Sequence, residues 1–252
     1  MNFKTTEMYY MKRFSICFLS LIMAASLFSQ ETPAVDKINS SAGTIELHFV
    51  GHGTLMFKIN EFVIHVDPVR SSGSYASLPK ADLILVTHEH GDHLDAGLIS
   101  DLRKESTRML CNANSAKTVT WAQVMKPGDV VKVGNFTIEA VYAYNIKNER
   151  APGQPFHQKG DGNGYIITLG DKRIYVAGDS ENTPEMKALK DIDVAFLPMN
   201  LPYTMNPEMV ADAAKAFKPV ILYPYHYGNT KTDEIVSLLK GTGIDVRIRS
   251  LK

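Results

Sequence analysis

The 252-residue sequence predicts an α/β fold in which two β-sheets pack face to face and helices cover their outer faces. The first observation is a pattern that occurs twice. A β-hairpin at residues 55–66 leads into Asp67, a second hairpin at 165–177 is followed by Asp179, and an apolar strand comes next in each half. The second observation is that segments with helical periodicity alternate with the strands. This repeated order of elements indicates a duplicated architecture with one sheet in each half.

The composition is typical of a globular protein with a large hydrophobic core. Hydrophobic residues make up 44% of the chain and charged residues 21%, and the length suits one large domain or two small ones. Lys plus Arg and Asp plus Glu both number 27. Because binding to nucleic acid relies on a cationic surface, this neutral balance argues against a nucleic-acid partner.

The N-terminus has the organisation of a secretory signal peptide. Lys12 and Arg13 precede an apolar stretch over residues 14–28, and small and polar residues follow. The stretch of about 15 residues is shorter than the roughly 20 that a membrane-spanning helix needs. We therefore expect a signal peptide over 1–29, a linker over 30–43 and a folded domain over 44–252. The protein is expected to be exported, periplasmic or secreted, with no membrane attachment after signal removal; an uncleaved N-terminal anchor is the alternative.

Strands dominate the first half of the predicted domain. Residues 45–50 alternate apolar and polar side chains, as in a strand with one buried face. Further strands are expected at 55–59, 62–66, 83–87 and 108–111. A helix is expected over residues 94–104, where leucine and isoleucine side chains share one face, and another at 115–124, capped by Ser115.

The second half repeats strands and helices after a long polar segment. Strands are expected at 130–133, 136–142, 164–169, 173–177, 194–197, 220–223 and 246–248. Thr183 and Asn206 each precede a proline, the signature of a helix start, and predict helices at 184–190 and 207–217. A last helix is expected at 232–240. The segment 145–163 has no periodic pattern, and a loop of that length usually has a function.

The strongest candidate site is the segment His88-Glu89-His90-Gly91-Asp92-His93, which directly follows the apolar strand. His88 and His90 are two residues apart, so their side chains point the same way on an extended chain and can share a metal. Gly91 lets the backbone bend, so that Asp92 and His93 can serve a second metal. Imidazole and carboxylate donors suit zinc and similar divalent ions.

A metal needs further ligands, and the ends of other strands offer them. Asp179 follows its hairpin in Ala-Gly-Asp, and a carboxylate there can bridge two metals. His226 follows the strand at 220–223, and His157 lies in the long polar segment. His52, in the turn Gly-His-Gly, either contacts the site or is a turn histidine bonded to backbone.

These motifs, in this order, resemble the metallo-β-lactamase superfamily, and within it the stand-alone hydrolases related to the ascorbate-phosphate lactonases. The similar segments are Gly51 to Thr54, Asp67-Pro68, Ala143-Tyr144-Asn145, Phe156 to Gly160 and Tyr203-Thr204-Met205. The resemblance covers about residues 44 to 250. It implies a four-layer αββα sandwich with a dinuclear metal site between the two sheets.

The resemblance also implies roles for individual residues. His88 and His90 would bind the first metal, Asp92, His93 and His226 the second, and Asp179 would bridge the two. Asp67 would orient a ligand through hydrogen bonds. The third ligand of the first metal is open between Asn145 and His157, and His157 is favoured because the resembled branch has a Phe-His at this place.

The function expected is an exported metal-dependent hydrolase that uses a metal-bound hydroxide on an ester-type bond: a lactone, a phosphodiester or another acyl bond. Asp92 would orient the hydroxide or carry its proton, and Asn145 and Tyr203 would line the substrate pocket. The cofactors would be two divalent ions, zinc first, with manganese or iron as alternatives. The partner would be a small-molecule substrate. The alternative is a metal-binding protein of the same fold with a binding or sensing role and little turnover.

Overall fold

A computed structural model describes residues 35–251, and two seven-stranded sheets form its centre. The first sheet has the strand order β1-β2-β3-β4-β5-β6-β7. Its strands are β1 (Val35–Ser40), β2 (Gly43–Gly51), β3 (Thr54–Ile59), β4 (Phe62–Val66), β5 (Leu83–Val86), β6 (Arg108–Cys111) and β7 (Gln123–Val124). A 3-10 helix η1 (Arg70–Ser72) lies between β4 and β5.

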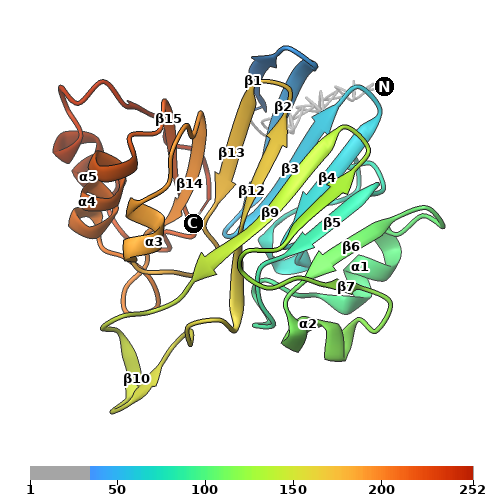
Figure 1. Ribbon diagram of the computed structural model, residues 1–252, viewed down its shortest axis with the longest axis horizontal. Coiled ribbons are helices and arrows are strands. Elements are labelled where there is room, and N and C mark those ends of the chain that lie inside the picture. The colour runs from blue at the N-terminus through green and yellow to red at the C-terminus, as the bar shows by residue number, and fades with distance from the viewer. Residues whose placement is uncertain (1–34, 252) are drawn as a thin grey trace, which may run out of the picture. The chain divides into compact units, whose positions relative to one another are not determined.

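The second sheet has the order β16-β15-β14-β13-β12-β9-β8. Its strands are β8 (Val130–Val133), β9 (Phe136–Ala143), β12 (Gly162–Leu169), β13 (Lys172–Val176), β14 (Val194–Pro198), β15 (Ile221–Tyr225) and β16 (Asp245–Val246). A separate small hairpin, β10 (Glu149–Ala151) with β11 (Gln154–Pro155), projects from the body of the domain (Figure 1).

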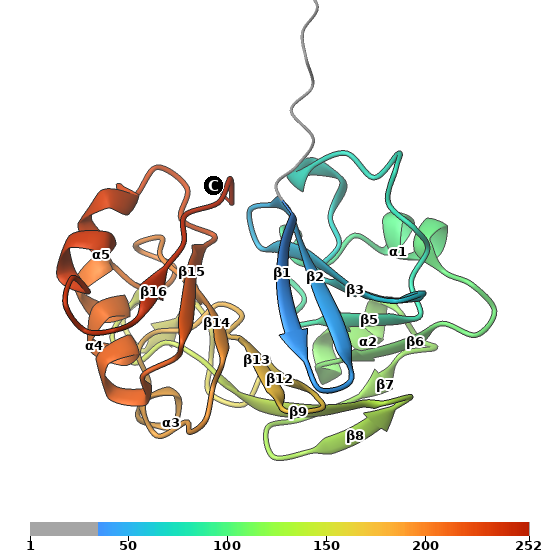
Figure 2. The same ribbon diagram turned by 90° about the horizontal axis from the view of Figure 1, so that it is seen from above.

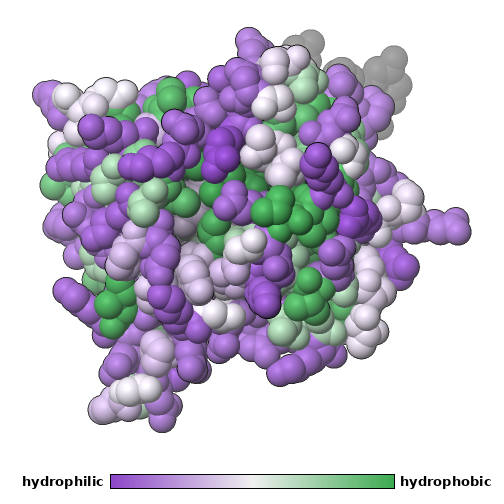
Figure 3. Space-filling model, viewed as in Figure 1, coloured by the Kyte–Doolittle hydropathy of each residue, from purple (hydrophilic) through white to green (hydrophobic). Residues whose placement is uncertain are grey.

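Helices cover the outer faces of both sheets, so the domain has four layers, as Figure 2 shows. Helices α1 (Ala96–Leu102) and α2 (Ala113–Thr118) lie on the first sheet. Helices α3 (Pro184–Lys187), α4 (Pro207–Phe217) and α5 (Thr232–Leu238) lie on the second. In the face seen in Figure 3, apolar side chains gather near the middle, over β9 and β12. The predicted α/β sandwich of two sheets with outer helices is confirmed.

The main core lies between the two sheets and explains why β5 is apolar throughout. Leu83 and Leu85 point into the core between the sheets, whereas Ile84 and Val86 point outward to a smaller apolar cluster that includes Ile99 of α1. Because side chains alternate across a strand and both faces are covered, a continuous apolar run is stable here.

The repeated order of elements predicted from the sequence is also present. In the first sheet β3 and β4 form an antiparallel hairpin and β5 then pairs with β4 in parallel. In the second sheet β12 and β13 form the hairpin and β14 pairs with β13 in parallel. The residues that follow β4, β5, β13 and β15 therefore meet at corresponding sheet edges, which is where the candidate ligands lie.

Three segments differ from the predictions by more than a few residues at an end. The expected linker over 30–43 is wrong for residues 35–43, because 35–40 form β1, which pairs with β2 from Val35 opposite His48 to Ser40 opposite Gly43. The helix predicted at 115–124 ends at Thr118 and is capped by Asn112, whose side chain accepts from the Ser115 amide. The segment 145–163 contains the β10–β11 hairpin and the start of β12.

The N-terminal predictions lie outside the residues that the structure describes. This applies to the signal peptide over 1–29 and to residues 30–34 of the linker. Within residues 35–251, no helix is both long and apolar enough to cross a membrane.

Candidate metal centre

The predicted ligands come together at one edge of the sandwich, although they are far apart in the chain. The segment 88–93 follows β5, Asp179 follows β13, and His226 follows β15. His157 lies two residues after β11, at the end of the projecting hairpin. Two sets of donor atoms result, with Asp179 between them.

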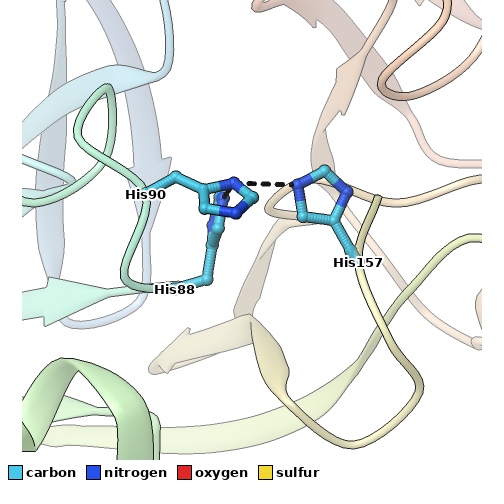
Figure 4. Close-up of side chains that lie close together, drawn as sticks. All are labelled: His88, His90 and His157. Carbon is cyan, nitrogen blue, oxygen red and sulfur yellow. Dashed lines mark hydrogen bonds between the residues drawn. The ribbon is translucent and has the colours of Figure 1, made fainter. Parts of the chain in front are cut away.

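The first set consists of three imidazoles, drawn in Figure 4. His88 Nε2 lies 3.0 Å from His90 Nδ1, and His157 Nε2, which comes from another part of the chain, lies 3.3 Å from the same His90 atom. Asp179 Oδ2 is 3.4 Å from His157 Nε2 and 4.0 Å from His88 Nε2. Around a tetrahedral ion with bonds of 2.0–2.1 Å, donors would be about 3.4 Å apart, so this spacing fits a metal.

The second set consists of Asp92, His93 and His226. Asp92 Oδ2 is 3.4 Å from His226 Nε2 and 3.8 Å from His93 Nε2. The other oxygen of Asp179, Oδ1, is 3.4 Å from His93 Nε2 and 3.5 Å from His226 Nε2. Because each oxygen of Asp179 faces a different set, this carboxylate has the geometry of a bridging ligand.

A hydrogen bond on the far side of the His93 ring directs its other nitrogen to the centre. His93 Nδ1 lies 2.8 Å from Asp67 Oδ2, which can only accept, so Nδ1 carries a proton and Nε2 faces Asp179. Nε2 of His93 and Oδ1 of Asp179 are buried and have no hydrogen-bond partner among residues 35–251. A buried carboxylate this close to a buried ring nitrogen needs a positive charge between the two atoms, which is either a proton on Nε2 or a metal ion bound by both. The donor set therefore fits a divalent metal.

His88 is held by the same carboxylate, through Thr87. The Thr87 hydroxyl donates to Asp67 at 2.7 Å, so at 3.0 Å it accepts from His88 Nδ1. Asp67 thereby orients two rings at once, and it is itself completely buried, with its second oxygen accepting from the Thr87 amide at 2.7 Å. This position agrees with the role in ligand orientation that the sequence predicts for Asp67.

The pKa values of the histidines follow from burial and from the carboxylates. Burial lowers the pKa of His157 to about 4 and holds that of His88 well below its ordinary value, so both rings are neutral at pH 7. For His93, burial is outweighed by Asp179 and Asp67, which raise its pKa well above the ordinary value. Burial likewise opposes the charge on Asp179, but His226 and His93 hold its pKa well below the usual range. A site with this negative potential attracts cations.

Asn145 and His157 do not compete for one position; they form a pair. Oδ1 of Asn145 accepts at 2.8 Å from both the amide and Nδ1 of His157. Its Nδ2 donates to Glu181 Oε1 at 3.2 Å and to the Tyr203 carbonyl at 2.9 Å. The role of Asn145 in substrate binding stays a prediction; in this structure its hydrogen-bonding groups are used by His157, Glu181 and Tyr203.

His52 belongs to the site, although the sequence left its role open. Its Nε2 lies 3.3 Å from Asp92 Oδ2, and its ring centroid is 3.8 Å from that of His226. Its backbone has a φ of 50°, in the left-handed region that side chains rarely adopt; Asp67 (45°) and His226 (48°) share this feature. Backbone in this region of φ often marks a functional site. The feature of the sequence that could have indicated a role for His52 is its position between two glycines.

A cavity of about 460 Å³ opens beside the centre. Its lining residues are His52, His90, Asp92, Arg150, Phe156, His157, Asp179, Asn200, Tyr203 and His226. Tyr203 is 45% exposed and its ring meets that of Phe156 edge-on, with centroids 5.1 Å apart. The structure thus places Tyr203 at the cavity, as predicted, and adds Arg150 and Phe156 from the projecting hairpin region.

Comparisons with known proteins agree with this geometry. The family described as "Beta-lactamase superfamily domain" matches residues 46–226. A UPF0173 metal-dependent hydrolase of Thermococcus kodakarensis is 30% identical over 195 residues, which is 73% of this chain and 84% of that protein. A relative with the same description from Anoxybacillus flavithermus is 28% identical over 222 residues, 81% of this chain and 97% of that protein.

Solved structures share this fold. A crystal structure described as a putative metal-dependent hydrolase from Parabacteroides distasonis is 46% identical, with a TM-score of 0.84 over 88% of this chain and 100% of that chain. Igni18, a metallo hydrolase from Ignicoccus hospitalis, shares the fold at 22% identity, with a TM-score of 0.68 over 82% of this chain and 95% of that chain. The narrower resemblance to ascorbate-phosphate lactonases stays a prediction. The chain belongs to the metallo-β-lactamase superfamily.

Proposed function

We propose that this protein is a hydrolase that holds two divalent cations and cleaves an ester-type bond in a small molecule. The observation that carries the proposal is Asp179, whose two oxygens face two separate sets of histidine and aspartate donors. His88, His90 and His157 would hold the first ion, and Asp92, His93 and His226 the second. Relatives described as metal-dependent hydrolases support the reaction class.

Besides the metal ligands, the chain supplies a group that can orient the attacking water. Divalent ions in such a centre lower the pKa of a water toward neutrality and polarise a substrate oxygen. Asp92 is the group placed to handle the proton, because its side chain is 49% exposed and lines the cavity while Oδ2 faces the second set. Although burial opposes it, hydrogen bonds from His226 and His52 hold the pKa of Asp92 well below the ordinary value. Asp92 is thus ionised and able to orient a water.

The cavity walls suggest what the substrate carries. Arg150 lines the cavity, and its Nη2 donates to the carbonyl of Phe156 at 3.0 Å. No carboxylate of residues 35–251 forms an ion pair with it within 4.0 Å. Phe156 and Tyr203 supply aromatic surface on the same side. We therefore propose a substrate with an anionic group, a carboxylate or a phosphate, that the guanidinium recognises.

Metal-dependent turnover tests the function. The full chain is stripped with a chelator and reloaded with Zn²⁺, Mn²⁺ or Fe²⁺. Each form is then assayed on a nitrophenyl ester, a chromogenic lactone and a bis(nitrophenyl) phosphodiester. We expect two ions per chain and hydrolysis of at least one class only after loading. If the chain binds two ions but hydrolyses none of these substrates, the binding or sensing alternative is favoured. If the chain binds no ion, both the hydrolase proposal and this alternative are contradicted.

Export is proposed from the N-terminal sequence alone. The test is to produce the full chain in bacteria, fractionate the cells and measure the mass of the protein. We expect the protein outside the cytoplasm, shortened by residues 1–29. A full-length protein in the cytoplasmic fraction would contradict the export proposal and leave the hydrolase proposal intact.

A further inference from the structure

The turn that carries His52 is built against the metal centre. It joins β2 to β3 and is anchored by a backbone hydrogen bond of 3.1 Å from the His226 amide to the His52 carbonyl. Next to it, Gly53 packs so closely that an added Cβ would lie 3.0 Å from His93 Cε1 and 3.5 Å from His226 Cδ2. The turn thus packs against two of the proposed ligands of the second ion through backbone atoms, and this fixes the position of the His52 backbone.

Three imidazoles converge on one carboxylate oxygen. Asp92 Oδ2 lies 3.3 Å from His52 Nε2, 3.4 Å from His226 Nε2 and 3.8 Å from His93 Nε2. The nitrogen of His52 is therefore the one nearest to this oxygen. Ligand atoms of His52, Asp92 and His226 also lie close enough together to share one ion.

We propose that His52 is a further ligand of the second metal position, which would then have a different preference from the first. This rests on the proposed function, since it assumes that the centre holds two ions. The first position has donors from His88, His90, His157 and Asp179, a set that suits four-coordinate zinc. The second position has donors from His52, Asp92, His93, Asp179 and His226.

The larger donor set of the second position points to a particular class of ion. Zinc in proteins is mostly four-coordinate, whereas manganese and iron(II) are found with five or six nitrogen and oxygen ligands. A site with five protein donors therefore favours Mn²⁺ or Fe²⁺ over Zn²⁺. We infer that His52 sets this preference and that the protein takes up a mixed pair of ions when both kinds are offered.

The test separates coordination by His52 from a hydrogen bond to Asp92. The full chain is stripped of metal and titrated with Mn²⁺, alone and in the presence of one equivalent of Zn²⁺. Bound metal is measured by elemental analysis and the Mn²⁺ signal by electron paramagnetic resonance. The variants are His52→Ala and His52→Gln; glutamine keeps a donor for Asp92 but lacks the imidazole nitrogen. His48→Ala is the matched control, since His48 lies on β2, half-buried beside Glu46.

We expect wild type and His48→Ala to bind Mn²⁺ at one position beside the zinc. In both His52 variants the affinity for Mn²⁺ should fall by about tenfold or more, while one equivalent of zinc is retained. Unchanged Mn²⁺ affinity in His52→Gln, with two ions bound in wild type, would overturn the ligand assignment and leave the proposed function standing. Failure of wild type to bind any metal would overturn both. Circular dichroism of each variant is measured as a control that the fold is kept.

Discussion

Nε2 of His93 and Oδ1 of Asp179 face each other at 3.4 Å, both buried and both without a hydrogen-bond partner in residues 35–251. Asp67, at 2.8 Å, holds a proton on the other nitrogen of the His93 ring. The buried pair needs a positive charge between its two atoms, because each unsatisfied group costs on the order of 1–3 kcal/mol. Without a metal a proton on His93 supplies this charge, since burial is outweighed by Asp179 and Asp67, which raise the pKa of the ring well above its ordinary value. A divalent ion bound by both atoms would take the place of that proton.

The first prediction concerns the ring orientation of His157. Replacing Asn145 with alanine removes the acceptor of His157 Nδ1 and frees the ring to rotate. The affinity for the ion at the first position should fall by about 10- to 100-fold, as for other residues that orient a metal ligand. Titration of the metal-free protein with zinc measures this. Asn135→Ala, at the exposed turn between β8 and β9, is the control; equal zinc affinity in both variants would contradict the role of Asn145.

The second prediction concerns the close approach of the β2–β3 turn. The Cβ of Gly53→Ala would lie 3.0 Å from Cε1 and 3.3 Å from Nδ1 of His93, so the ring must shift by a few tenths of an ångström. We expect weaker binding of the second ion with little loss of fold. Gly91→Ala is the control, because an added Cβ there meets no atom within 4 Å. Metal titration of the two variants measures their affinity for the second ion. Equal affinities would contradict the prediction, because the turn could then move without weakening the binding of this ion.

The third prediction concerns substrate recognition by Arg150. Substrates are compared in pairs that share the scissile bond and differ in whether they carry a carboxylate. Arg150→Ala should raise KM for the charged member by about tenfold or more and leave the neutral member nearly unchanged, since one charge-assisted hydrogen bond is lost. Arg150→Lys should recover part of the loss. An equal change for both members would indicate that the hairpin, and not the charge, had been disturbed.

The fourth prediction concerns stability at acidic pH. His65 is fully buried, and its Nε2 contacts the Pro79 carbonyl at 2.9 Å, so the neutral ring donates there. Burial lowers the pKa of His65 to about 4, and the hydrogen bond to Pro79 offsets only part of that effect. Because the folded-state pKa lies below the unfolded value near 6.5, the unfolded chain binds a proton first.

The contribution of neutral His65 to the free energy of unfolding is thus fully present above about pH 6.5. It is lost as the pH falls toward 4, and its total size is on the order of 3 kcal/mol. His65→Gln keeps a donor for Pro79 but cannot titrate. Denaturant unfolding of the chelator-treated proteins between pH 7 and 4 measures the difference. As the pH falls, the free energy of unfolding should decrease less steeply in the variant than in the wild type. Parallel curves of free energy against pH would contradict the role given to His65.

How far the sequence predicts the site depends on how local each contact is. His88, His90, Asp92 and His93 are close together in the chain, and Asp179 and His226 each follow a strand of the second sheet, so their pattern could be recognised. The pairing of Asn145 with His157 could not, because it depends on the path of the hairpin between them. The sequence leaves the role of His52 open for the same reason, because only the packing of the turn brings it to Asp92, 40 residues further along the chain.

The strand β1 shows the same limit for the fold. Only Ile38 in it is buried, so residues 35–40 lack the apolar pattern of a strand. Its stability comes from pairing with β2 and from Asp36, whose carboxylate accepts from Arg249 Nη2 at 2.6 Å, 213 residues away. Tyr223 on β15 donates to the same carboxylate. Such long-range contacts leave no periodic signal in the sequence.

An anomalous-scattering map tests the central claim most directly. Crystals of the full chain, loaded with metal, are measured at the absorption edge of the ion supplied. Two peaks are expected, one among His88, His90 and His157 and one among Asp92, His93 and His226, with an oxygen of Asp179 facing each. A single peak, or none with metal supplied, would contradict a centre that holds two ions.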